Sequence, residues 1–229
     1  MFRKFFLKKQ YKKVDEIFDD NSFNQNLYQG LLKAFNTLLG DIKDGELYSF
    51  GIFTSGEYNY AGITANTYSG LDKVIKEYKD NSSYTNVSVD DLKHELKWSP
   101  CDWVYNCEIN NDELDVVDQR LHELNELSNL IIDKHNDFDI AIEVVDNKVI
   151  QRLNKLYCDC LIKLKTEHSE VSRNIIFGIW LGDQSEEDRV SFIQQINSTE
   201  LSEKYITESR LGIETYESRQ EKRKHNKPL

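Results

Sequence analysis

Glu57, Asn66, His94 and Asp102 are the residues of this chain whose types best suit catalysis. A carboxylate close to a tryptophan can have a raised pKa and act as a general acid, and Asp102 directly precedes Trp103. We expect the four residues at the ends of a hairpin and near a tryptophan-rich turn, where they could converge on one cleft. The alternative is structural: Asp102 caps a turn, Asn66 ends a strand, and Glu57 is a solvated turn residue. We favour this alternative and assign no catalytic residue.

The four cysteines could bind a metal, but their spacing argues against a shared site. On a helix, Cys158 and Cys160 would point about 200° apart. Cys101 and Cys107 lack the short spacing of a zinc knuckle. No secretory signal is recognisable at the N-terminus, so we expect a cytoplasmic protein with reduced thiols. No metal site is predicted.

Motifs for other cofactors are absent from the sequence. The five histidines are scattered, and there is no His-Glu-x-x-His motif. There is also no serine nucleophile elbow and no glycine-rich phosphate loop. We therefore expect no cofactor.

The most distinctive stretch runs Trp98-Ser99-Pro100-Cys101-Asp102-Trp103. Pro100 suits the first position of a helix, where its missing N–H leaves no bond unmade, and Ser99 is placed to cap that helix. Trp98 and Trp103 flank the cap in the manner of a hydrophobic staple. The pattern therefore indicates a rigid structural motif that the two indole rings hold against the core.

The elements around these residues follow from hydrophobic periodicity. An amphipathic helix is predicted within residues 23–44, followed by strands at 47–54 and 58–65 with a short hairpin loop at 55–57. Thr67 and Ser88 are suited to cap the next two helices.

The second half is predicted to be mainly helical. Two apolar stripes separated at His135-Asn136-Asp137 favour an antiparallel helical hairpin. Residues 174–181 form a bulky run typical of a buried central strand, and Ser185 can cap a further helix. The expected core comprises Phe50, Ile52, Trp98, Trp103, Phe177, Ile179 and Trp180.

These elements predict an α+β fold, with a small, mostly antiparallel sheet covered by helices and a long helical hairpin in the second half. We expect a single domain over residues 1–216, in which 112–166 can be a helical insertion. Residues 217–229 are expected to be a basic tail.

Charge is distributed unevenly along the chain. Residues 1–13 carry a net charge of +6 and residues 217–229 carry +3, whereas residues 14–216 carry −20. Such an acidic body repels phosphate backbones and attracts cationic proteins. No run of residues reaches the roughly 18 apolar positions that a membrane span requires. We therefore expect a protein partner, with neither nucleic acid on the acidic body nor a membrane span.

Three segments together resemble a known family. They are the strand Tyr48-Ser49-Phe50-Gly51-Ile52-Phe53-Thr54, the triplet Ala65-Asn66-Thr67 and the stretch Leu96–Trp103. The chain is similar to a family of uncharacterised bacterial proteins, domain of unknown function 4303, over most of its length. That family has no assigned catalytic residues, so the resemblance implies none here. In size and acidity such proteins resemble the immunity partners of secreted bacterial toxins.

Two functional hypotheses follow. The first is a non-catalytic binding protein, such as an immunity protein that neutralises a cationic toxin stoichiometrically, with Tyr58 and Tyr60 as aromatic anchors for the partner. The second is an enzyme or sensor that binds a small molecule in a cleft near the Trp98–Trp103 turn. The identity of the partner and the oligomeric state stay open at this point.

Overall fold

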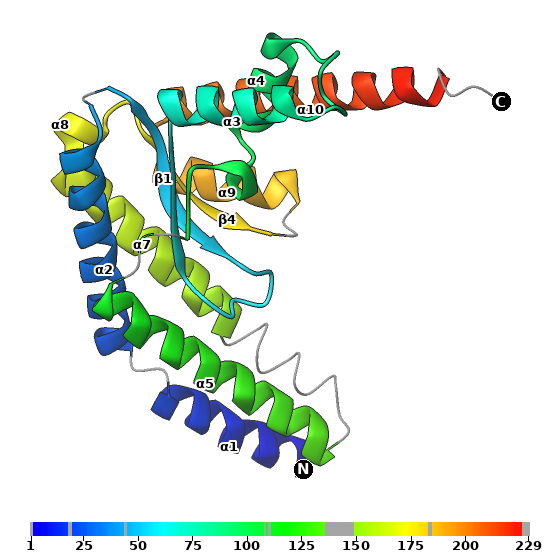
Figure 1. Ribbon diagram of the computed structural model, residues 1–229. Helices are drawn as coiled ribbons and strands as arrows, with labels where there is room; N and C mark the ends of the chain where they lie inside the picture. The colour runs from blue at the N-terminus through cyan, green and yellow to red at the C-terminus, as the bar shows by residue number, and fades with distance from the viewer. Residues whose placement is uncertain are drawn as a thin grey trace.

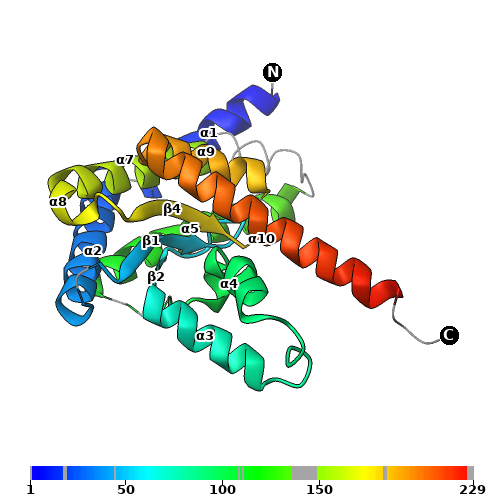
Figure 2. The ribbon, with the colours of Figure 1, turned by 90° about the horizontal axis from the view of Figure 1, so that it is seen from above.

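The computed structural model describes residues 2–17, 20–43, 45–107, 109, 111–135, 149–182 and 185–225. These residues form a small β-sheet with helices on both of its faces (Figures 1 and 2). The α+β class predicted from the sequence is therefore confirmed. Within these residues, no helix combines the length and the apolar character that crossing a membrane would require.

The first elements are α1 (Phe2–Ile17), α2 (Asp20–Asp41), β1 (Leu47–Thr54), β2 (Gly62–Thr67) and α3 (Tyr68–Asp80). They are followed by α4 (Val89–Lys97), the 3₁₀-helix η1 (Pro100–Asp102), β3 (Tyr105–Asn106) and α5 (Asp112–His135). The last are α7 (Gln151–Glu167), α8 (Ser169–Ser172), β4 (Ile176–Leu181), α9 (Glu186–Ile196) and α10 (Thr199–His225).

The strands are ordered β3-β2-β1-β4. β1–β2 and β2–β3 pair antiparallel, and β1–β4 pair parallel, so the sheet is mostly antiparallel as predicted. Gly51 pairs with Gly178. A Cβ atom at Gly51 would lie 1.9 Å from the carbonyl oxygen of Gly178, so this close approach requires glycine.

The prediction that 174–181 forms a central strand is wrong in one respect, because β4 is an outer strand. The strand is nevertheless buried throughout. Helix α9 packs against it, and the side chain of Asn197 binds the backbone of Phe177 through two hydrogen bonds. The Phe177 N–H donates to Oδ1 (2.9 Å), and Nδ2 donates to the Phe177 carbonyl (2.7 Å). Asn197 thus occupies backbone groups that an exposed edge would present to other chains.

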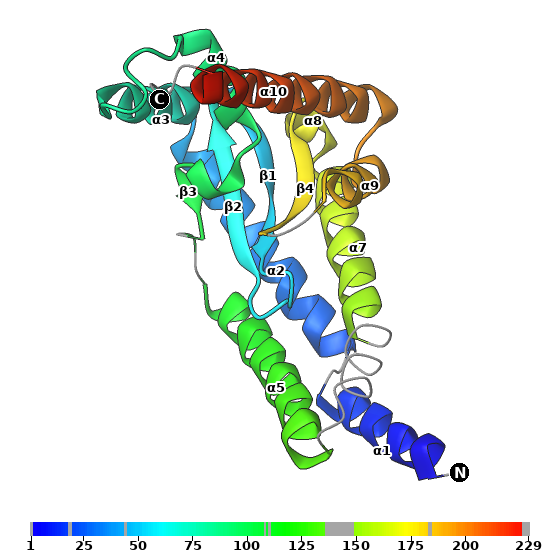
Figure 3. The same ribbon diagram turned by 90° about the vertical axis from the view of Figure 1, so that its right-hand side faces the viewer.

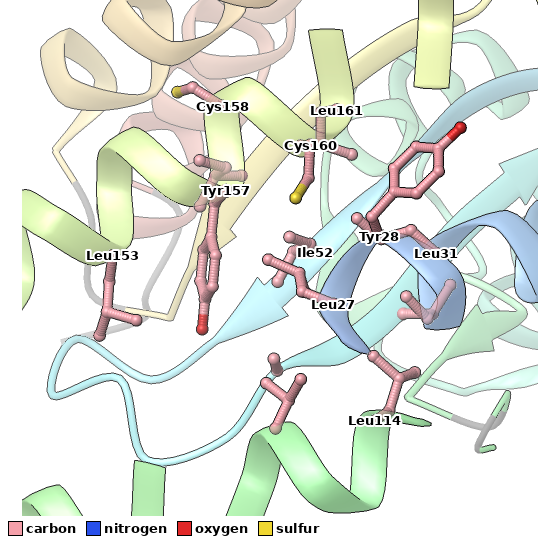
Figure 4. Packing of buried hydrophobic residues seen from close by; sticks show 14 of the residues in the cluster. Leu27, Tyr28, Leu31, Ile52, Leu114, Leu153, Tyr157, Cys158, Cys160 and Leu161 are labelled. Carbon is pink, nitrogen blue, oxygen red and sulfur yellow. The ribbon is translucent and has the colours of Figure 1, made fainter. Parts of the chain in front are cut away.

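The sheet separates two hydrophobic clusters. On one face, β1 and β4 pack with α2, α5 and α7 around a cluster of mainly aliphatic and aromatic side chains, which includes Leu27, Leu161 and Tyr157 (Figure 4). On the other face, Trp98, Trp103 and Trp180 pack with residues from α3, α4, α9 and α10. All seven predicted core residues are buried, with at most 6% of the surface of each exposed.

The hairpin differs from its prediction at the second strand. β2 begins at Gly62 rather than at Tyr58, so the connection covers residues 55–61. Tyr58 has a φ of 57°, a left-handed conformation that cannot continue a strand. The loop is fixed from α5, because the Ala61 N–H donates to Oδ1 of Asp118 over 2.7 Å. Burial raises the pKa of that carboxyl group.

The predicted helical hairpin corresponds to α5 and α7, and each of these helices packs against α2 (Figure 3). The turn predicted at His135-Asn136-Asp137 falls largely outside the described residues.

The segment expected to be a basic tail is helical as far as His225, because α10 continues through it. Arg219 of α10 forms an ion pair with the buried side chain of Glu95, and its Nε lies 2.8 Å from Oε1. At Gly212, α10 crosses α4 so closely that a Cβ atom would lie 2.5 Å from the carbonyl oxygen of His94.

Candidate functional site

The structure does not bring the four catalytic candidates together. Asn66 pairs with Ser49 near the start of β1, whereas Glu57 lies in the loop that follows the end of β1. The two residues are therefore at opposite ends of the hairpin. Glu57 is exposed, and its carboxylate accepts a hydrogen bond from the side chain of Asn59 (3.0 Å).

Asn66 takes part in a buried structural network. Its Nδ2 donates to the hydroxyl of Tyr48 (2.9 Å), which in turn donates to the carbonyl of Lys97 (2.8 Å). Its Oδ1 accepts from the Thr67 N–H (3.0 Å). The network ties β1 and β2 to the end of α4, and burial raises the pKa of Tyr48. Thr67 also caps α3 as predicted, since its hydroxyl accepts from the Gly70 N–H.

Asp102 links two elements. Its Oδ1 accepts from the hydroxyl of Tyr78 on α3 (2.7 Å), and its Oδ2 accepts from the hydroxyl of Ser99 (2.5 Å). Burial, together with the bond to Asp102, raises the pKa of Tyr78. Two hydroxyl donors on one carboxylate indicate a structural role, because they fix the η1 turn against α3.

The tryptophans pack against one another. The ring centroids of Trp98 and Trp103 are 6.4 Å apart, and each ring also contacts Trp180, at 6.2 and 5.0 Å. The indole N–H of Trp103 donates to the carbonyl of Lys97 (3.1 Å), and that of Trp98 donates to Glu208 (3.2 Å). These contacts favour the structural interpretation of the stretch 98–103.

A cleft of about 400 Å³ lies beside this turn, and we call it the Trp-turn cleft. Its lining includes His94, Trp98, Cys101 and Arg189, but not Asp102. Nη1 of Arg189 lies 3.3 Å from Glu186, while its buried Nε has no acceptor among the described residues. The thiol of Cys101 is exposed, and its pKa is raised by partial burial and by the neighbouring Asp102.

A larger cleft of about 850 Å³ lies between α7 and α9, and we call it the α7–α9 groove. Its lining is Gly56, Tyr58, Gln151, Asn154, Lys155, Cys158, Asp159, Ile162, Leu181, Asp188, Ser191, Phe192 and Gln195. The sequence patterns did not predict this groove. The sequence pattern that could have indicated the groove is a set of amide and carboxylate residues at helical spacing, on two helices whose other faces are apolar.

The two tyrosines predicted as anchors lie on different sides of the sheet. Tyr58 belongs to the cluster formed with α2, α5 and α7, and its hydroxyl donates to Oδ1 of Asn154 in the α7–α9 groove. Tyr60 is half-buried against the tryptophan cluster, with its ring centroid 6.2 Å from that of Phe53. Only Tyr58 is therefore placed at the groove.

The cysteines have separate surroundings. Cys160 lies 2.8 Å from Oδ1 of Asn24, whereas Cys158 is directed at Gln195 over 3.9 Å. Burial raises the pKa of Cys158 to about 11 and that of Cys160 to about 12, so both thiols are protonated at neutral pH. In the part of the chain that the structure describes, no group of three or more His, Cys, Asp or Glu residues is arranged to hold a metal ion.

The comparisons with known proteins identify a family. Residues 27–198 match the family described as Domain of unknown function (DUF4303), and this match extends from α2 to the end of α9. No curated protein and no solved structure matches the chain. The matched region includes the sheet, the Trp-turn motif and both sides of the α7–α9 groove. The chain therefore belongs to the DUF4303 family, whose function is unknown.

Proposed function

We propose that this protein is a non-catalytic binding protein that holds a cationic protein partner in a stoichiometric complex, as an immunity protein does when it neutralises a toxin. The observation that carries the proposal is the net charge of −20 on residues 14–216. A surface field of this sign steers a cationic protein toward the complex and repels anionic competitors.

Exposed acidic side chains lie at the N-termini of two helices. Asp112 and Asp115 are in the first turn of α5, and Glu187 and Asp188 are in the first turn of α9. Carboxylates at helix N-termini also interact favourably with the helix dipole, so these acidic patches are compatible with a stable fold.

The positions and contacts of the catalytic candidates also support a binding function rather than a catalytic one. Asp102 and Asn66 are engaged by neighbouring side chains that hold the fold together, and Glu57 lies at the other end of the hairpin from Asn66. A catalytic constellation requires its members within hydrogen-bond reach of one reacting atom.

The test is the salt dependence of association with the natural partner. The partner would be isolated on the immobilised protein from its own cells, purified, and mixed back with the protein in a calorimeter and a stopped-flow instrument. We expect a one-to-one complex whose association rate falls at least tenfold when the salt concentration rises from about 0.05 M to about 0.5 M. A rate that does not change with salt, or a partner that is itself acidic, would contradict the proposal.

The second candidate function is small-molecule binding in the Trp-turn cleft by an enzyme or sensor. It rests on Arg189, whose unpaired buried Nε offers a donor beside the apolar surface of Trp98 and Pro100. Native mass spectrometry of the protein purified from its own cells distinguishes the two functions. A bound compound of low mass that is lost in Arg189→Ala favours the second, and a bound protein favours the first.

A further inference from the structure

We infer that the α7–α9 groove binds an extended, basic segment of the protein partner. This inference rests on the proposed function, because it names the site where the cationic partner is held. Four features of the groove support it: its shape, its hydrogen-bonding groups, its charge and the fixed position of the wall made by the hairpin loop.

The groove is elongated. Its lining residues on α7 run from Gln151 to Ile162, and those on α9 run from Asp188 to Gln195. At 1.5 Å per helical residue, these stretches are about 16 Å and about 10 Å long. An extended peptide advances about 3.3 Å per residue, so about four or five residues fit along the α7 side.

Amide side chains line the groove on both helices. Gln151 and Asn154 come from α7 and Gln195 comes from α9. Each amide has both donor and acceptor atoms, so it can form the same pairs with a peptide backbone as another strand would. Tyr58 donates to Oδ1 of Asn154, which orients the Nδ2 donors, and Nε2 of Gln195 lies 3.2 Å from the hydroxyl of Ser191.

The groove also has an apolar part. Leu181 and Phe192 contribute largely buried side chains, and Ile162 on the rim is 38% exposed. The methylene stems of arginine and lysine can pack on such a surface while their charged ends reach the polar rim.

The charge of the groove is negative. Asp159 and Asp188 line it, and the exposed Glu57 lies between two lining residues of the hairpin loop. Lys155 is the cation among the lining residues, and its Nζ lies 2.5 Å from Asp159. Asp188 accepts a hydrogen bond from the neutral hydroxyl of Ser185 (2.6 Å), and no lysine or arginine among the described residues forms an ion pair with it. A basic segment therefore complements this surface.

The wall made by the hairpin loop is fixed before any partner arrives. Tyr58 keeps a left-handed backbone, which is strained for a residue with a side chain and persists only where its surroundings hold it. Its hydroxyl is bound to Asn154, and Asp118 of α5 binds the loop at Ala61. A wall that needs no ordering on binding gives a higher affinity than a mobile one.

The test uses a capped pentapeptide of alternating glycine and arginine, with a matched peptide that has glutamate in place of arginine. The ¹⁵N-labelled protein gives side-chain NH₂ signals that report directly on Asn154 and Gln195. We expect the arginine peptide to shift these two signals and the glutamate peptide to leave them unchanged. Equal shifts with both peptides, or none with either, would overturn the inference.

Three variants locate the binding. Asp188→Asn and Gln195→Ala should each lower the affinity for the arginine peptide about threefold. The first variant loses a surface charge pair with the peptide, and the second loses one hydrogen bond. Asp72→Asn, on the exposed surface of α3, makes the same charge change away from the groove and should have no effect. Equal weakening by Asp72→Asn and Asp188→Asn would show that only the overall charge matters.

The outcomes separate this inference from the proposed function. Peptide-induced shifts at other acidic surfaces, with Asn154 and Gln195 unmoved, would overturn the groove as the site while leaving a cationic partner in place. The salt dependence of partner association tests the proposed function independently of any peptide.

Discussion

The Trp98–Trp103 turn and the α7–α9 groove use polar side chains in different ways. At the turn, Asp102 binds Tyr78 and Ser99, so its carboxylate is occupied by the fold itself. In the groove, amide and carboxylate side chains line an open space of about 850 Å³. Rare residues such as tryptophan and proline therefore have a structural role in this protein. Common polar residues on the surfaces of α7 and α9 form the surface that is available to a partner.

Loss of a ring from the tryptophan cluster should destabilise the protein more than any other change considered below. Trp180→Ala removes a fully buried ring that contacts Trp98, Trp103 and Tyr205. We expect a loss of about 3–5 kcal/mol in the free energy of unfolding, measured by urea denaturation. A loss below about 1 kcal/mol would show that the cluster is not part of the core that stabilises the fold.

Gly212→Ala tests how tightly α10 is packed on the same side. The added Cβ would meet the carbonyl oxygen of His94 at 2.5 Å, so the helices must separate, and we expect a loss of about 1–3 kcal/mol. Gly40→Ala in α2 is the matched control, because nothing lies within 4 Å of its Cβ position. The control should be neutral or should stabilise the protein by up to about 1 kcal/mol through helix propensity. Equal effects of the two variants on the urea midpoint would refute the close crossing.

Asp102→Asn tests whether the carboxylate of the turn is structural. The amide keeps one acceptor for Tyr78 or Ser99 and loses the charge that strengthens both bonds, so we expect a loss of about 1–2 kcal/mol in the free energy of unfolding. Binding of the arginine peptide should be unchanged at temperatures where the variant is folded. A variant as stable as the original protein would contradict the structural role.

Lys165 is a half-buried lysine that belongs to neither region, and its pKa predicts how stability depends on pH. Nζ of Lys165 donates to the carbonyls of Ile175 (2.5 Å) and Ser172 (3.2 Å), and burial lowers its pKa to about 8. An unfolded lysine titrates near 10.4, so between these values the unfolded state binds more protons and stability rises with pH. We expect a higher urea midpoint at pH 9.5 than at pH 7.5, and a smaller difference in Lys165→Met. If the difference between the two urea midpoints is as large in Lys165→Met as in the original protein, other groups cause the pH dependence.

Local signals in the sequence predicted much of the fold. The bounds of β1 and the caps at Thr67, Ser88 and Ser185 depend on neighbouring residues, and the structure confirms them. The start of β2 could not be predicted in this way. The conformation of Tyr58 depends on contacts with helices that lie about 60 to 100 residues later in the chain.

The site was harder to predict than the fold. In the stretch 98–103, the burial of Trp98 and Trp103 was predicted correctly, because large aromatic rings favour the core. The predicted cap at Ser99 is wrong, because its hydroxyl accepts no backbone N–H of η1 and donates to Asp102 instead. The α7–α9 groove is formed by polar surfaces of two helices and a loop distant from one another in sequence. Each surface alone looks like an ordinary solvated helix face, and only the packing of α7 and α9 on the sheet brings them together.

The most direct test of the account is to measure stability and peptide affinity side by side in Asp188→Asn and Asp102→Asn. We predict that Asp188→Asn binds the arginine peptide about threefold more weakly. Its free energy of unfolding should fall by at most about 1 kcal/mol, because the exposed carboxylate interacts only with the N-terminus of α9 and with Ser185. We predict the reverse for Asp102→Asn, a destabilised protein with unchanged affinity. Loss of affinity in Asp102→Asn together with full affinity in Asp188→Asn would place binding at the tryptophan turn and contradict the account.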